Sequence, residues 1–178
     1  MINLHLVNVR EIKEDEINFV LSSFIKSNRF GLQTKYMLFD IYLNMHKPML
    51  IDLCAADSTK ILVAEYNGFI YGYIIYDDIR NVIHYYYVKQ SFRKLGIGGL
   101  LIKNCNFDPN KVIFFSLLSD SITHKCKLKL GEKKSNSSKL KREILYSYNP
   151  NFLDQNYNYT LYKKDLIAEL KKTDDNKK

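Results

Sequence analysis

Hydrophobic residues recur at helical spacing in the first third of the chain. In residues 14–26, and again in residues 34–45, apolar side chains return every three or four positions and so share one helix face. The pattern predicts two amphipathic helices. Pro48 should end or restart the second one because proline lacks a backbone N–H, and residues 49–56 can then form a short helix. The apolar positions are Ile17, Val20, Leu21, Phe24 and Ile25, then Met37, Leu38, Ile41 and Met45.

The pattern changes to that of β-strands after residue 59. Residues 60–66 and 69–76 are rich in β-branched and aromatic side chains, and Asn67-Gly68 between them is the strongest short signal for a β-hairpin. Residues 82–88 have the same character and predict a third strand. Residues 2–10 alternate loosely and predict another. We therefore expect the middle of the chain to form a sheet.

The second half of the chain predicts shorter elements within the same domain. After a glycine-containing turn, residues 98–104 can form only a short helix, and the nearly all-apolar run 111–118 is typical of a strand buried on both faces. We expect one domain over residues 1–162, followed by a short helix and a polar tail over residues 163–178. The other expected elements are a helix over 120–130, a loop over 132–141 and a strand over 143–148.

Composition narrows the class of protein. The chain has 178 residues, of which 46% are hydrophobic, enough for one domain with a real core. The three cysteines have neither metal-ligand nor disulfide spacing, so we expect no metal site and a reducing, intracellular compartment. No apolar run approaches the ~18 residues of a membrane span, and the N-terminus lacks the apolar stretch of a signal peptide. The expected location is cytoplasmic.

The net charge of +8 favours acidic partners such as nucleic acid, a phosphorylated cofactor or an acidic protein surface. Eight of the basic side chains lie in residues 125–142, where only Glu132 opposes them. This segment is either a solvated loop or a contact surface for protein or nucleic acid. It contains no Tyr or Phe, which argues against a groove for single-stranded nucleic acid.

The residues with the clearest chemistry form a turn after the third predicted strand of the sheet. The sequence Arg93-Lys94-Leu95-Gly96-Ile97-Gly98-Gly99 follows that strand and opens a helix. Backbone N–H groups at a helix N-terminus bind anions, and the helix dipole favours negative charge there. Gly96 and Gly98 allow close approach to the backbone, while Arg93 and Lys94 add positive charge. The turn is therefore a candidate pyrophosphate site.

The segment 60–118 resembles the core of the GNAT family of N-acetyltransferases. That family carries Gln/Arg-x-x-Gly-x-Gly/Ala between its fourth strand and the next helix, which corresponds to the Arg93–Gly98 turn. Residues 61–74 match the hairpin before it. The resemblance implies an α/β fold with a mixed, mostly antiparallel central sheet flanked by helices, and acetyl-CoA as co-substrate. Residues 19–29 and 148–153 also resemble small GNAT-type proteins of tailed bacteriophages.

The resemblance also implies roles for individual residues. The backbone of Tyr86, Tyr87 and Val88 would hold the pantetheine arm, and the backbone near them would polarise the thioester carbonyl. The pyrophosphate would lie on the turn that follows. Its residues are Arg93, Lys94, Leu95, Gly96, Ile97, Gly98 and Gly99.

The catalytic acid and base are less clearly marked. Family members commonly use a Glu near the fourth strand and a Tyr after the next one, but this chain has no Glu in residues 69–131. His84 is the candidate base by position and by the usual pKa of histidine; the alternative is a strand histidine bonded to a neighbour. Ser119 and Tyr146 are candidates for the remaining catalytic role, although a capping or surface role is the more usual one for a serine in the position of Ser119.

Two functions from different classes follow from these residues. The first is acetyl transfer from acetyl-CoA to an amine acceptor. The second is a non-catalytic GNAT-fold protein that acts in assembly, for example in a virion, through the basic segment 125–142 and the C-terminal tail. Binding to nucleic acid is a third alternative, which the composition of that segment does not favour.

Overall fold

The computed structural model of the chain describes residues 4–29, 34, 36–108, 111–117 and 146–154. These residues form a six-stranded sheet in which every strand lies beside its neighbour in sequence. The first three pairings are antiparallel and the last two are parallel. The strands are β1 (Asn8–Glu11), β2 (Lys60–Tyr66), β3 (Phe69–Asp77), β4 (Val82–Val88), β5 (Ile113–Phe115) and β6 (Tyr146–Tyr148).

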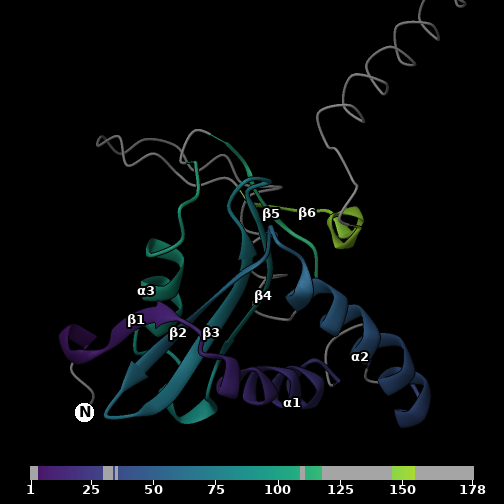
Figure 1. Cartoon of the computed structure of the whole chain (residues 1–178), viewed down its shortest axis with the longest axis horizontal. Helices are drawn as coiled ribbons and strands as arrows, with labels where there is room; N and C mark the ends of the chain where they lie inside the picture. The colour runs from purple at the N-terminus through teal and green to yellow at the C-terminus, as the bar shows by residue number, and fades with distance from the viewer. Residues whose placement is uncertain (1–3, 30–33, 35, 109–110, 118–145, 155–178) are drawn as a thin grey trace, which may run out of the picture.

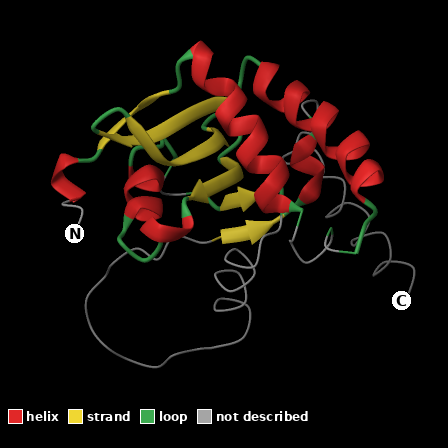
Figure 2. Ribbon diagram, turned by 90° about the horizontal axis from the view of Figure 1, so that it is seen from below, coloured by secondary structure: helices red, strands yellow, loops and turns green. Residues whose placement is uncertain are grey.

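Helices cover both faces of this sheet (Figures 1 and 2). Helices α1 (Ile17–Asn28) and α2 (Phe39–Ala55) pack on one face, and the short helix α3 (Ile97–Lys103) packs on the other. Short 3-10 turns complete the described elements: η1 (Leu4–Leu6), η2 (Glu14–Glu16), η3 (Gln90–Phe92) and η4 (Pro150–Leu153). The prediction of a mixed, mostly antiparallel sheet flanked by helices is confirmed.

The alternation of side chains along the strands divides the core into two layers. Val63, Tyr73 and Ile75 point to the face covered by α1 and α2, where Phe24 and Leu53 meet them. On the other face, Leu62, Ala64 and Ile74 pack against Ile97 and Leu101 of α3. Because strand side chains alternate between faces, the nearly all-apolar runs found in the sequence belong to strands buried on both sides.

The predicted hairpin between β2 and β3 is confirmed. Asn67 and Gly68 both have positive φ, 51° and 77°, as the two central residues of a type I′ turn require. The β3–β4 turn depends instead on a buried carboxylate. Asp77 accepts hydrogen bonds from the backbone N–H of Arg80 at 2.8 Å and from its Nε at 2.6 Å. Together the two turns align β2, β3 and β4, which precede the candidate site.

Several predicted boundaries in the N-terminal region were wrong, including the start of the helix predicted over 34–45, which begins at Phe39. Residues 39–55 form one helix that runs through Pro48, where two were expected. Tyr42 before the proline and Leu50 and Leu53 after it are all buried, so packing holds the two halves in line despite the missing N–H. The first strand begins only at Asn8, because residues 4–6 form a 3-10 turn.

The strand expected over 111–118 is shorter than predicted. Within the described residues 111–117, only Ile113–Phe115 form β5. The other predictions for residues 118–145, which include the helix over 120–130, the basic segment 125–142 and the start of the last strand, lie outside the described residues, as does the predicted helix and tail over 163–178.

Candidate functional site

The turn between β4 and α3 combines two left-handed residues. Lys94 has a φ of 65° and Gly96 a φ of 91°, and the 3-10 turn η3 leads into them. Left-handed residues within a turn let successive backbone N–H groups converge on one side, an arrangement that binds anions. Glycine adopts this conformation without strain, whereas a Cβ on Gly96 would also lie 2.9 Å from Leu4 Cδ1. The left-handed φ is the feature that calls for glycine here, because the end of the Leu4 side chain can turn aside.

Helix α3 begins at this turn without a side-chain cap. Gly96 occupies the N-cap position and, having no side chain, makes no side-chain cap hydrogen bond. The first intrahelical bond runs from Leu100 N to Gly96 O at 3.0 Å, so the N–H groups of Ile97, Gly98 and Gly99 precede the helical ladder. Gly96 and Gly99 are exposed, while the buried side chain of Ile97 fixes the helix to the sheet. The helix therefore presents an accessible group of backbone donors.

The side chains around the turn are basic. Arg93 and Lys94 are both exposed, as is Leu95 between them and the glycine. The Nε of Arg93 donates a hydrogen bond to the Val88 carbonyl at 3.1 Å. This bond holds the guanidinium against the end of β4, beside the start of α3. The backbone donors and two cationic side chains thus lie close together at the start of α3.

Among the described residues, no strand pairs with the edge of β4 that lies next to this turn. β5 pairs with β4 only at Val82 and Ile83, and the last bond between them runs from Ser116 N to Ile83 O at 3.2 Å. At the far end of β4, Lys89 N donates to Tyr71 O on β3. Because peptide groups alternate in direction along a strand, those of Tyr86 and Val88 point away from β3, toward the side of β5.

Tyr86 and Val88 also lie beside α3. A Cβ on Gly98 would stand 3.8 Å from the Tyr86 ring and 3.9 Å from Val88 Cγ2. The ring of Tyr87 lies on the opposite face, where it stacks on Tyr73 with centroids 5.4 Å apart. The structure therefore brings the side chains of Tyr86 and Val88 next to the turn. The side chain of Tyr87 lies on the other face, so only its backbone is near them.

His84 occupies a bulge where β4 leaves β5. Ile75 pairs with Tyr85 and Tyr76 with Ile83, so His84 has no opposite residue on β3. Its side chain is 0% exposed, and Nδ1 lies 2.9 Å from Ser116 Oγ. Nε2 is buried and has no hydrogen-bond partner among the described residues. Burial, with a smaller effect of Arg80, lowers the pKa of His84 to about 4, so the ring is neutral at pH 7.

Ser116 is the residue that sequence reasoning missed at this point. It is fully buried, and its Oγ is the only described partner of the His84 ring. Its position within the nearly all-apolar run 111–118 was a weak signal, because single serines are common in and beside strands. Of the other catalytic candidates, Ser119 lies outside the described residues. Tyr146 lies in β6, in register with Ile113; its side chain lies outside the description.

The described residues contain neither a metal-ligand cluster nor a membrane-spanning helix. Among the described residues, no three His, Cys, Asp or Glu side chains are grouped so that they would hold a metal ion. No helix in the described part of the chain is both long enough and apolar enough to cross a membrane.

Comparison with known proteins agrees with this geometry. Residues 31–105 match the model of the acetyltransferase (GNAT) family, while no curated protein sequence matches the chain. A proposed acetyl transferase from Pyrococcus furiosus superimposes with a TM-score of 0.51 at 14% identity, over 75% of this chain and 98% of the other.

Two further solved structures superimpose less closely. A possible acetyltransferase from Clostridium difficile gives a TM-score of 0.45 at 22% identity, over 75% and 96% of the two chains. A Salmonella typhimurium structure solved with its cofactor acetyl-CoA gives 0.35 at 17% identity, over 55% and 59%. This chain has the GNAT fold, and its residues 31–105 carry the sequence pattern of the acetyltransferase (GNAT) family.

Proposed function

We propose that this protein is an acyl-CoA-dependent N-acyltransferase that moves an acetyl group from acetyl-CoA to an amine. The observation that carries the proposal is the uncapped, exposed N-terminus of α3 beside the edge of β4 that β5 leaves uncovered. The N-terminus of α3 suits a pyrophosphate, and the edge of β4 suits an extended pantetheine arm. The family match over residues 31–105 supports the same reaction.

The turn would hold the pyrophosphate through its backbone. Donors at Ile97, Gly98 and Gly99 begin the helix, and the dipole of α3 favours an anion in front of them. Arg93 and Lys94 would add charge-assisted hydrogen bonds. The bond from Arg93 Nε to Val88 O orients the guanidinium before any ligand arrives, which lowers the ordering entropy lost on binding.

The edge of β4 would hold the arm and the reacting carbonyl. The peptide groups of Tyr86 and Val88 point to the side on which β4 and β5 separate. An extended chain can hydrogen-bond along a strand edge as an added strand does. A backbone N–H directed at the thioester oxygen would stabilise the negative charge that forms there when the amine attacks.

We propose His84 as the group that accepts the amine's proton. It lies at the point where the two strands separate, and its Nε2 has no partner among the described residues. Ser116 fixes the ring through Nδ1; if the hydroxyl accepts the Nδ1 proton, Nε2 carries the free electron pair. The buried ring must become accessible to the amine when substrates bind. A structural role, in which His84 only packs and bonds to Ser116, is the alternative that mutation distinguishes.

Binding of CoA tests the proposal directly. Isothermal calorimetry with acetyl-CoA should give a Kd in the micromolar range, about −8 kcal/mol. Pantetheine, which lacks the pyrophosphate, should bind at least ~30-fold more weakly, a difference of about 2 kcal/mol. No heat with acetyl-CoA at ~1 mM would refute the enzyme hypothesis.

No observation favours the non-catalytic assembly function. The basic segment 125–142 on which it depends lies outside the described residues, and no virion protein is among the relatives named above. The same segment would carry any binding to nucleic acid.

A further inference from the structure

Three tyrosines lie together on the face of the sheet that α1 covers, next to the edge of β4 that no described strand pairs with. Tyr73 on β3 is in register with Tyr87 on β4, and their rings stack with centroids 5.4 Å apart. Tyr85 points to the same face, because side chains alternate along a strand. Tyr73 and Tyr85 are buried, whereas Tyr87 is half-buried. Of the three rings, that of Tyr87 is therefore the one that a ligand can contact.

Serine hydroxyls of α1 hold the two buried rings in place. Ser23 Oγ donates a hydrogen bond to the Tyr73 hydroxyl at 3.1 Å, and Ser27 Oγ lies 2.8 Å from the Tyr85 hydroxyl. Ser23 and Ser27 are four residues apart, so they face the sheet from the same side of the helix. Because Tyr73 is fixed, it gives the ring of Tyr87 a rigid support. A rigid aromatic surface loses little conformational entropy when a ligand binds to it.

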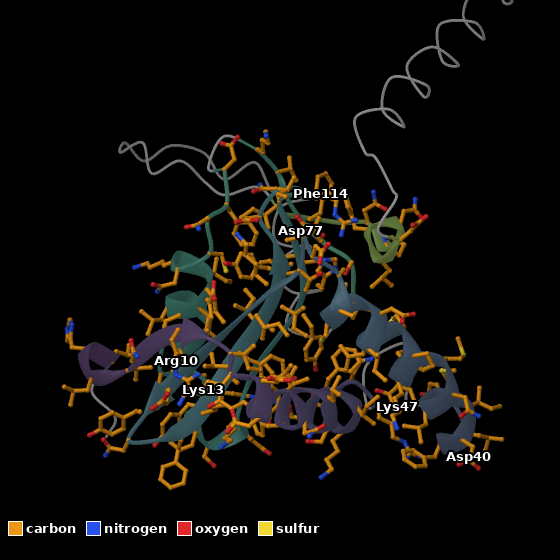
Figure 3. All side chains as sticks on the ribbon, in the orientation of Figure 1. Arg10, Lys13, Asp40, Lys47, Asp77 and Phe114 are labelled. Atoms are coloured by element: carbon orange, nitrogen blue, oxygen red, sulfur yellow. The ribbon has the colours of Figure 1, made fainter. Side chains whose placement is uncertain are left out.

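Tyr87 lies beside the strand edge proposed for the pantetheine arm. Figure 3 labels Asp77 and Phe114 at the end of the sheet where β4 and β5 pair, and Arg10 in the row of paired residues that ends at Tyr87. The candidate pyrophosphate site lies on the opposite face of the sheet, the one that α3 covers. An arm that reaches the edge from that face leaves the face of Tyr87 to the acceptor amine.

Two cations follow this part of β4. Lys89 Nζ lies 5.3 Å from the centroid of the Phe19 ring on α1, and Arg93 is bonded to the Val88 carbonyl. Burial raises the pKa of Tyr85 to about 12, and the charged group with the largest effect on this hydroxyl is Arg93, which acts in the opposite direction. Two nearby positive charges oppose an acceptor that carries several ammonium groups, whereas an uncharged ring meets no such repulsion.

We propose that the acceptor is an arylalkylamine, a primary amine on a flat apolar group, and that the ring of Tyr87 sets this preference by stacking on that group. The inference rests on the proposed acetyl transfer and specifies its second substrate. The amine nitrogen bonds to the acetyl carbon, the C–S bond breaks, and the proton that the nitrogen loses goes to the base and then to the CoA sulfur. An aromatic pair favours binding by up to about tenfold beyond the burial of its area.

Steady-state acetyl transfer to three amines tests the preference, with acetyl-CoA in excess and release of the CoA thiol as the signal. The amines are phenethylamine, n-butylamine and spermidine. The wild type should give a kcat/KM for phenethylamine at least about 30-fold above that for n-butylamine, because the phenyl ring buries more apolar area. Spermidine should be the poorest acceptor, since it brings further positive charges to Lys89 and Arg93.

Variants of Tyr87 test the residue itself. Tyr87→Ala should lower the preference for phenethylamine over n-butylamine about tenfold, chiefly through the KM for phenethylamine, because the stacked ring is lost. Tyr87→Phe keeps the ring and should keep the preference. Phe69→Ala removes a ring that is 65% exposed on the β2–β3 hairpin, outside the proposed contact, and is the matched control. Circular dichroism melts verify that each variant folds.

Calorimetry with acetyl-CoA separates this inference from the proposed function. A wild type that does not bind acetyl-CoA refutes the proposed function. A wild type that binds acetyl-CoA but acetylates none of the three amines, or prefers n-butylamine or spermidine, overturns only the assignment of the acceptor. A preference for phenethylamine that survives Tyr87→Ala, or that is lost equally in Phe69→Ala, overturns the role of Tyr87.

Discussion

The Nδ1 atom of His84 on β4 lies 2.9 Å from the Oγ atom of Ser116, which immediately follows β5. This bond joins the two strands at the last position where they are in contact, since β4 pairs with β5 only at Val82 and Ile83. One pair of buried side chains thus stands at the start of the uncovered strand edge. Its properties allow tests of both stability and catalysis.

The stability of the fold should fall between pH 6.5 and pH 4 because of His84. Its pKa is lowered from 6.5 to about 4 in the folded chain, so the unfolded chain binds the proton more readily. The stabilising contribution is therefore complete above pH 6.5 and is lost as pH falls toward 4. A shift of this size corresponds to about 3 kcal/mol. Urea unfolding of wild type and His84→Asn at several pH values should show a flatter dependence for the variant. Parallel curves would contradict the assignment.

If His84 is the base, turnover should depend on it while CoA binding does not. His84→Asn keeps an amide that can bond to Ser116 but cannot take the amine's proton, so kcat should fall about a hundredfold. The calorimetric Kd for acetyl-CoA should stay within about threefold, because the turn is untouched. Ser116→Ala retains the imidazole and is the matched variant; it should lose less of kcat. Unchanged turnover of His84→Asn would assign the histidine a structural role.

Charge at Gly98 should decide whether CoA binds. Gly98→Glu places a carboxylate at the N-terminus of α3, where it would occupy the anion site, and should weaken acetyl-CoA binding at least ~100-fold, or nearly 3 kcal/mol. Gly98→Ala separates bulk from charge, because its Cβ would make only an ordinary contact, 3.8 Å from Tyr86. Lys103→Glu makes a charge change at the exposed end of the same helix and should alter affinity less than about threefold. Equal effects of all three variants in calorimetry would argue against a site at the turn.

Gly72 and Gly99 should respond to alanine in opposite directions. A Cβ on Gly72 would lie 2.6 Å from the Tyr87 carbonyl oxygen, which belongs to the backbone and cannot turn aside. Gly72→Ala should therefore lower the free energy of unfolding by about 2–3 kcal/mol. A Cβ on Gly99 would have no atom within 4 Å, and alanine favours the helix, so Gly99→Ala should stabilise by about 0.5 kcal/mol. Urea unfolding at pH 7 measures both. If Gly72→Ala leaves the free energy of unfolding unchanged, β3 and β4 can separate there at little cost.

The sequence by itself determined the local elements of the sheet and the position of the turn. Asn67-Gly68 set the first hairpin because few residues tolerate positive φ, and both indeed adopt it. The expected limits of β2 and β4 agree with the structure, since each is a dense run of β-branched and aromatic residues between polar turns. The glycines of the Arg93–Gly98 turn likewise marked the start of α3, within one residue.

Only the tertiary structure decided features that depend on contacts between distant segments. Helix α2 continues through Pro48 because Tyr42 and Leu50, on either side of it, are buried in the same domain. β5 ends at Phe115 although the apolar run continues, because β4 diverges from it after Ile83. His84 is neutral because burial, which depends on distant segments, lowers its pKa; local spacing reveals neither this burial nor the bulge and the contact with Ser116. Periodicity reports which face of an element is apolar, whereas burial, strand separation and pKa depend on which other segment covers that face.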